Sequence, residues 1–273
     1  MLVAFAAFAL CAMLLIIFVF REKPPTPPPQ DPATENEEEI EPVGLCEGMK
    51  ILCSKSPDYI LTLLTGSILL GTLAYGYTAL IGQFMLPFGI DDVEFVSWAG
   101  VTYNFGGILG NLLASLVACK LPNKLEAVFL TVALTSTLTY IYFFVATMGA
   151  SRVNIIISCL LVGIANLPVF TVSYELAVQQ TMSLGIGEAL SCGLINSFGN
   201  VIGWASVIGM TPLLDQVTEK NSIISQTILT VLLGVSVICT IALVIRKPSK
   251  DKSSGDGVEL EPVTSAPEIN DRA

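Results

Sequence analysis

Apolar residues gather along this sequence in seven long runs, separated by short polar or charged segments. A helix needs about 20 apolar residues to cross a hydrocarbon core of about 30 Å. Lipid offers the backbone no hydrogen-bond partners, so each run is predicted to be helical. The pattern therefore predicts an all-α integral membrane protein with seven transmembrane helices. The predicted spans are Leu2–Phe20, Tyr59–Met85, Phe95–Cys119, Leu125–Met148, Val153–Val178, Gly187–Thr211 and Ile223–Ile245.

Two segments lie outside this pattern. Residues 22–58 begin with five prolines between Pro24 and Pro29 and continue with a cluster of glutamates. Such a composition buries too little apolar surface to fold, which predicts an extended linker. The tail, residues 246–273, is rich in Ser, Asp and Glu and is predicted to be disordered.

The positions of Lys and Arg predict the orientation in the membrane. The segments between spans are assigned alternately to the two sides of the membrane. Of the 13 basic residues in the chain, all except Arg152 and Lys220 then fall on one side. That side is predicted to be cytosolic. The linker and the tail would then be cytosolic and the N-terminus external. The plasma membrane is the expected location, with an organelle membrane as the alternative.

Composition narrows the function classes. The chain is 53% apolar and 13% charged, against about 25% charged in an average soluble domain. It has no histidine, which excludes histidine-ligated haem or zinc and a Ser-His-Asp triad. Its net charge of −10 argues against binding nucleic acid. The seven cysteines show no C-x-x-C pair, so we expect no metal, no cofactor and no enzymatic activity.

The polar residues inside the spans are the candidates for function, because they must face protein or a water-filled cavity. Asn196, Asn200 and Trp204 follow one another at intervals of four and share one helical face. They could line a solute path, or the two amides could bond a neighbouring helix. Gly199-x-x-x-Gly203 between them is predicted to be a close-packing face.

Further candidates lie in other spans. Tyr77 belongs to a Tyr-Gly-Tyr sequence well inside its run, where glycine allows a bend and a ring could hold a cation. Asn104 shares a face with Asn111, which we interpret as packing. The predicted substrate-binding residues are therefore Tyr77, Asn104, Asn196, Asn200 and Trp204.

A proline is expected to break the fifth span. Pro168 removes a helix hydrogen bond, and Asn166 is placed to serve the freed backbone groups. Transporters often bind solute at such breaks. Glu175 and Glu188 flank the loop that follows, where they could act in gating or simply stabilise helix ends.

Three stretches, Arg21–Pro28, Leu167–Val178 and Gly187–Asn196, resemble the feline leukaemia virus subgroup C receptor-related family, solute carrier family 49 of the major facilitator superfamily. The resemblance implies that the seven spans correspond to helices 6–12 of a twelve-helix transporter. Residues 1–21 would end an N-terminal bundle, and residues 59–245 would form the six-helix C-terminal bundle. A chain of 273 residues cannot hold twelve spans. We therefore expect either a truncated chain, whose partner is the missing N-terminal bundle, or a half-transporter that pairs with a second half-transporter.

The resemblance also implies a function. Family members move choline, ethanolamine or related small solutes by alternating access, and some have been described as haem exporters. Their ligand-contacting amide falls on Asn200, where relatives have glutamine, and their pocket tyrosine falls on Tyr77. The loop from Lys120 to Lys124 departs from many facilitators because it holds no carboxylate.

A seven-helix membrane receptor is the alternative, since its termini would lie on the same sides. The sequence speaks against it: the third span ends Ala118-Cys119-Lys120 rather than Asp-Arg-Tyr, and the last span lacks Asn-Pro-x-x-Tyr.

Overall fold

The computed structural model describes residues 10, 13, 45–121 and 124–246. The chain divides into two compact units, Met1–Glu41 and Pro42–Ala273, and the description below concerns the second. Of the predicted first span, only Leu10 and Met13 lie among the described residues; both are helical and exposed. The proline-rich part of the linker and the tail beyond Arg246 lie outside them.

Six helices are long and apolar enough to cross a membrane, and they coincide with the second to seventh predicted spans. The six-helix part of the prediction is thus confirmed, while the first predicted span, Leu2–Phe20, lies outside the described residues except at Leu10 and Met13. The helices run over Pro57–Phe88, Val93–Lys120, Leu125–Met148, Arg152–Thr181, Glu188–Leu214 and Glu219–Arg246.

Two of these spans are composed of several shorter elements. The first contains α3 (Pro57–Leu69), the π-helical η1 (Leu70–Tyr77), α4 (Thr78–Met85) and the short η2 (Leu86–Phe88). The fourth contains α7 (Arg152–Asn166) and α8 (Pro168–Thr181), with η4 (Met182–Leu184) after it. The continuous helices are α5 (Val93–Lys120), α6 (Leu125–Met148), α9 (Glu188–Leu214) and α10 (Glu219–Arg246).

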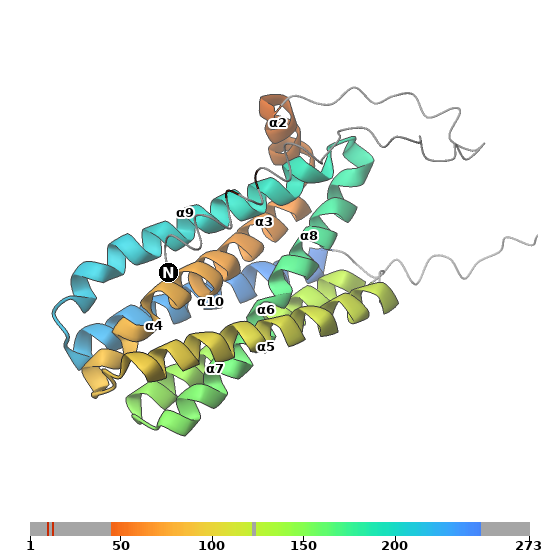
Figure 1. Ribbon diagram of the computed structural model, residues 1–273. Helices are drawn as coiled ribbons and strands as arrows, with labels where there is room; N and C mark the ends of the chain where they lie inside the picture. Colours follow the sequence, from red (N-terminus) through yellow and green to blue (C-terminus); the bar gives the residue numbers. More distant parts are fainter. Residues whose placement is uncertain (1–9, 11–12, 14–44, 122–123, 247–273) are drawn as a thin grey trace, which may run out of the picture. The chain divides into compact units, whose positions relative to one another are not determined.

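The helices pack as two groups joined through α8 and α10. In one group α3 contacts both α9 and α10; in the other α7 contacts both α5 and α6 (Figure 1). The helix α10 also packs against α6, and α8 contacts α3, α5 and α9. This arrangement leaves α5 and α9 on the two sides of α8, which is the part of the fold that positions the candidate site.

Glycines set the close contacts within both groups. On α5, Gly106 and Gly110 lie against the backbone of α7 at Leu160 and Ile164, and Gly163 of α7 lies against the backbone of Tyr103. We call this contact the α5–α7 glycine seam. In the other group, Gly71 of η1 meets Gly199 and Gly203 of α9 in the same way. The predicted close-packing role of Gly199 and Gly203 is confirmed.

The break in the fourth span lies where the proline predicts it. The helix α7 ends at Asn166, and α8 starts with Pro168 as its first residue. The prediction that Asn166 serves freed backbone groups is wrong. Its Nδ2 instead donates to the hydroxyl of Tyr103 at 3.0 Å and ties α7 to α5.

The helix α2 (Leu45–Lys55) corrects the prediction that residues 22–58 are extended. The overall richness in Pro and Glu concealed an amphipathic segment at its end. Met49 and Leu52, three positions apart, lie beside Tyr59 of α3 and Phe198 of α9. Leu52 is only 2% exposed and belongs to the hydrophobic core. Apolar burial on the bundle therefore stabilises the last part of the linker as a helix.

We expect Leu52→Asp to detach α2, because it places a carboxylate in an apolar contact at a cost of several kcal/mol. Limited trypsin digestion of the purified chain should then cut after the exposed Lys50 at least tenfold faster than in the parent, a ratio set by that cost. Glu47→Ala, an exposed position on the same helix, is the control and should leave the rate unchanged. Equal rates in both variants would show that the packing of Leu52 does not hold α2.

Candidate functional site

The π-helical stretch turns two neighbouring tyrosines toward different surroundings. Tyr75 is half-buried, and its hydroxyl donates to Oδ1 of Asn196 on α9 at 2.8 Å. Tyr77 is fully buried, and its hydroxyl lies 3.3 Å from Sγ of Cys159 on α7. Tyr75 therefore faces α9 and the space beside it, while Tyr77 faces the interior of the bundle.

Aromatic rings continue from Tyr75 onto α8. The ring of Phe170 meets the ring of Tyr75 edge to face at 6.5 Å between centroids, and Tyr174 meets Phe170 at 6.0 Å. Phe170 and Tyr174 are four positions apart and therefore share one face of α8. All three rings are partly accessible. Such rings present their negative faces to any cation that enters.

Two amides lie alongside these rings on α9. Asn196 accepts the hydrogen bond from Tyr75, and the exposed Asn200 donates from Nδ2 to the backbone oxygen of Asn196 at 2.8 Å. We call the five residues the aromatic–amide strip: Tyr75, Phe170, Tyr174, Asn196 and Asn200. It combines π-faces with amide dipoles, and none of its members carries a formal charge.

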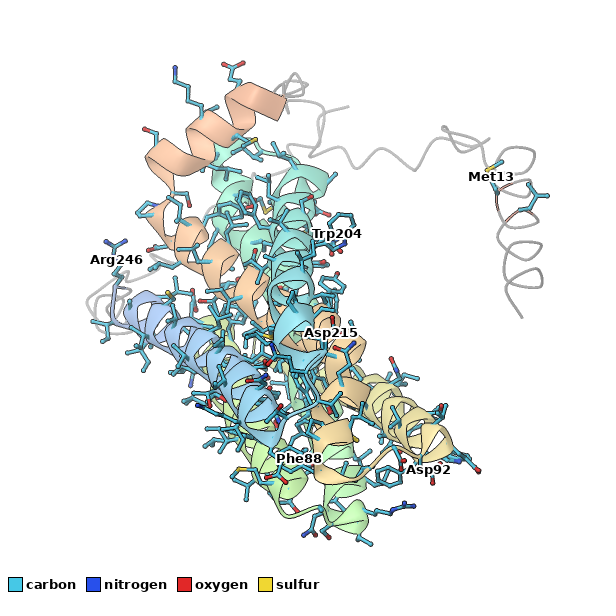
Figure 2. The ribbon with its side chains drawn as sticks, turned by 90° about the vertical axis from the view of Figure 1, so that its left-hand side faces the viewer. Met13, Phe88, Asp92, Trp204, Asp215 and Arg246 are labelled. Atoms are coloured by element: carbon cyan, nitrogen blue, oxygen red, sulfur yellow. The ribbon has the colours of Figure 1, made fainter. Side chains whose placement is uncertain are left out.

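A groove of about 550 Å³ opens at one end of the strip, between α4 and α9. Its volume is in the range of small-molecule sites. Tyr75 and Asn200 belong to both the strip and the groove, and Trp204 and Ile208 extend its wall. Trp204 is 74% exposed and projects from α9 on the side away from α10 (Figure 2). The groove thus joins two residues of the strip to a large exposed indole.

The predicted substrate-binding residues divide into two sets. Asn196, Asn200 and Trp204 lie together on α9 beside Tyr75. Tyr77 lies apart from them. Its ring centroid is 4.8 Å from that of Phe143 and 5.6 Å from that of Tyr103. Its place in the binding site stays a prediction, but its surroundings are those of a core residue.

Asn104 and Asn111 lie on α5. The side chain of Asn111 accepts a hydrogen bond from Thr171 of α8 at 3.1 Å, which confirms its packing role. Asn104 is exposed, and its Nδ2 donates to the backbone oxygen of Gly100 on the same helix at 2.8 Å. Seven residues from Asn111, it lies on the same side of α5. A role for Asn104 in binding stays a prediction.

Charged groups lie at the ends of the helices. Glu175, near the end of α8, and Glu188, the first residue of α9, are both exposed. At the opposite end of the bundle, Arg152 lies 3.3 Å from Asp92, and its guanidinium is 5.3 Å from the ring centroid of Phe95. This contact fastens the start of α7 to the start of α5. The gating roles predicted for the two glutamates stay predictions.

Sequence reasoning missed three members of the strip: Tyr75, Phe170 and Tyr174. A usable signal existed for the two on α8, because aromatic residues four apart directly after a helix-breaking proline share a face. The Tyr-Gly-Tyr sequence indicates two candidate rings, Tyr75 and Tyr77, but does not show which of them faces α9. That choice depends on the π-helical register of η1, which no residue pattern specifies.

Six helices long and apolar enough to cross a membrane, two of them broken, define an integral, multi-pass membrane protein. Residues 1–187 match the family model of the Major Facilitator Superfamily, which is more than half of the chain. The chain belongs to the Major Facilitator Superfamily.

Relatives refine this assignment. The chain is 24% identical over 189 residues to the choline/ethanolamine transporter FLVCR1 of Mus musculus, covering 69% of this chain and 33% of the relative. It is 25% identical to the choline/ethanolamine transporter flvcr2a of Danio rerio, over 77% of this chain and 44% of the relative. It is 26% identical to solute carrier family 49 member A3 of Danio rerio, over 71% of this chain and 39% of the relative. The resemblance to solute carrier family 49 is thereby confirmed. The chain spans less than half the length of these relatives. Because the matches are to transporters, they do not favour the alternative of a seven-helix membrane receptor.

Proposed function

We propose that the six-helix bundle is one half of an alternating-access transporter, and that the aromatic–amide strip is its wall of the solute pocket. The proposed solute is a small organic cation of the choline or ethanolamine type. The observation that carries the proposal is the hydrogen bond from Tyr75 to Asn196 beside the rings of Phe170 and Tyr174. It fixes a ring face and an amide next to each other on an accessible surface.

Electrostatics favour a cation over an anion. The helices α8 and α9 contain no Lys or Arg, and the carboxylates of Glu175 and Glu188 lie near the ends where the two helices meet in sequence. An anion at the strip would find no opposite charge on these helices, whereas a quaternary ammonium group would find aromatic faces. Haem fits less well, since its two carboxylates would need cationic partners and the chain has no histidine to bind iron.

The names of two relatives agree with this choice. FLVCR1 of mouse and flvcr2a of zebrafish are choline/ethanolamine transporters, and the regions that match include most of this chain. In this proposal the bundle corresponds to the C-terminal bundle of a full transporter. A second bundle, opposite α5 and α9, would complete the pocket and rock against this one.

Topology and gating follow from the same arrangement. We place the Lys120–Lys124 turn in the cytosol, as the distribution of basic residues favours. Glu175 and Glu188 then lie toward the cytosolic end of the pathway. In this proposal they attract the cation to the strip or release it from there.

Trp204 offers a direct test on the purified chain, because the chain contains two tryptophans and Trp98 can be removed as Trp98→Phe. We expect choline to change the emission of Trp204 with saturation in the millimolar range, since the strip supplies one wall of the pocket. Dimethylbutanol, the uncharged carbon isostere of choline, should bind roughly tenfold more weakly, because it lacks the attraction between cation and ring. Equal titrations with both compounds, or no response to choline, would contradict the proposal.

A further inference from the structure

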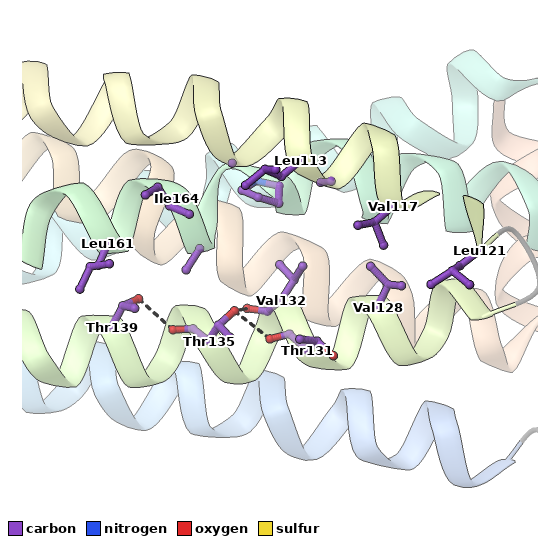
Figure 3. A pocket seen from close by; sticks show the side chains of 14 residues that line it. Leu113, Val117, Leu121, Val128, Thr131, Val132, Thr135, Thr139, Leu161 and Ile164 are labelled. Atoms are coloured by element: carbon purple, nitrogen blue, oxygen red, sulfur yellow. Dashed lines mark hydrogen bonds between the residues drawn. The ribbon is translucent and has the colours of Figure 1, made fainter. Parts of the chain in front are cut away.

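A second groove lies outside the candidate site, between α5 and α6. Its volume is about 570 Å³. Val117 of α5 and Leu121, the residue directly after α5, lie on one side. Val128 and Thr135 of α6 lie on the other, and Pro168 contributes to the floor. Figure 3 shows these side chains along the two helices. Small residues, Gly110, Ala114 and Ala165, keep the groove open because they fill little of it.

The polar side chains that line the groove do not require a polar ligand. Its polar side chains are three threonines spaced four apart on α6, Thr131, Thr135 and Thr139. Each hydroxyl donates to a backbone oxygen one turn earlier, those of Ala127, Thr131 and Thr135, at 2.8–2.9 Å. Figure 3 shows the bonds to Thr131 and Thr135. With their donors satisfied within the helix, the threonines present a surface that suits a hydrocarbon chain.

The length of the groove matches one leaflet of a bilayer. From Val128 to Thr139, eleven residues of α6 at about 1.5 Å each give a length of about 16 Å. Half of a hydrocarbon core of about 30 Å is about 15 Å. A single acyl chain that enters at the Leu121 end would therefore lie along the groove down to the middle of the membrane.

The charge at the open end selects the headgroup. Lys120 ends α5 and Lys124 directly precedes α6, and both are exposed beside the groove residues Leu121 and Val128. Glu126, in the first turn of α6, places one carboxylate near the two lysines, which leaves this end of the groove net positive. Two lysines at a membrane surface attract anionic lipid, and their ammonium groups donate to phosphate.

We propose that the α5–α6 groove binds an anionic phospholipid, with one acyl chain along Val117, Thr135 and Leu161 and the phosphate at Lys120 and Lys124. The site is separate from the aromatic–amide strip, which lies between α8 and α9.

Native mass spectrometry of the purified chain tests this site. The chain is taken from micelles that contain equal amounts of phosphatidylglycerol and phosphatidylcholine with identical acyl chains. We expect the parent to retain phosphatidylglycerol preferentially. Lys120→Gln with Lys124→Gln should reduce that preference roughly 25-fold, since each lysine contributes about a factor of five. Lys220→Gln, a cation near the start of α10, is the matched control and should retain it.

Filling the groove gives an independent readout. Thr135→Phe places a ring in the groove and should reduce retention of both lipids, while Leu138→Phe, 63% exposed on the same helix and outside the groove, should not. Thr131→Phe repeats the test one turn nearer the lysines if Thr135→Phe does not give a monodisperse protein. Equal retention of both lipids by the parent would overturn the proposal. Retention unaffected by the groove-filling variants would do the same.

Discussion

Replacement of Tyr75 by alanine is expected to weaken choline binding by the purified chain about tenfold or more, as followed through Trp204. The variant loses a ring face, which contributes about 0.5–2 kcal/mol to holding a cation. It also loses the hydroxyl that donates to Asn196, worth about 1 kcal/mol. Tyr75→Phe keeps the ring and loses the hydrogen bond, so we expect a smaller effect of roughly threefold to fivefold.

Two other tyrosines serve as controls for this result. Tyr142→Ala on α6 removes a partly exposed ring that has no place in the strip and should leave binding unchanged. Tyr77→Phe removes the buried hydroxyl beside Cys159, which should affect stability and not affinity. If Tyr77→Phe weakens choline binding while Tyr75→Phe does not, the assignment of the aromatic–amide strip as the binding site is wrong. Tyr77, the tyrosine predicted from the sequence, would then be the residue that binds choline.

The second large effect is expected at the α5–α7 glycine seam. A side chain at Gly163 would overlap the backbone oxygen of Tyr103, and neither helix can give way without separating the pair. We expect Gly163→Val to destabilise the chain by more than about 4 kcal/mol, a loss typical of severe overpacking at a buried site. Size-exclusion chromatography in detergent should show little or no monodisperse protein.

Gly100→Val is the matched control on α5, since a Cβ at Gly100 would meet no atom within 4 Å. It should change stability by less than about 1 kcal/mol, in the direction of a small gain, because valine has a higher helix propensity than glycine. A Gly163→Val protein that elutes and melts like Gly100→Val would show that the two helices are not held by direct backbone contact.

Much of this architecture could be predicted because the membrane simplifies the problem. The runs of apolar residues locate six helices, Pro168 locates the break in one of them, and Gly199 and Gly203 locate a close contact. Each of these signals acts within one helix or on one face. Composition misled at α2, where an average over the linker concealed the apolar pair Met49 and Leu52.

The candidate site was only partly accessible to sequence reasoning. The α9 half, Asn196, Asn200 and Trp204, follows from spacing on a regular helix. The Tyr75 half requires the register of a π-helical segment, in which residues turn through a smaller angle than in an α-helix. Phe170 and Tyr174 join the strip only because α8 lies beside α9. The spacing of residues along either helix does not predict which other helix it packs against.

The break at Leu167 divides one span into parts with different mechanical roles. The glycine seam and the bond from Asn166 to Tyr103 fix α7 to α5 on one side of the break. On the other side, α8 carries Phe170 and Tyr174. Pro168 has no N–H, so bending between the two parts breaks no hydrogen bond at that position. The span therefore provides a hinge, at which α8 can tilt while α7 keeps its place in the scaffold.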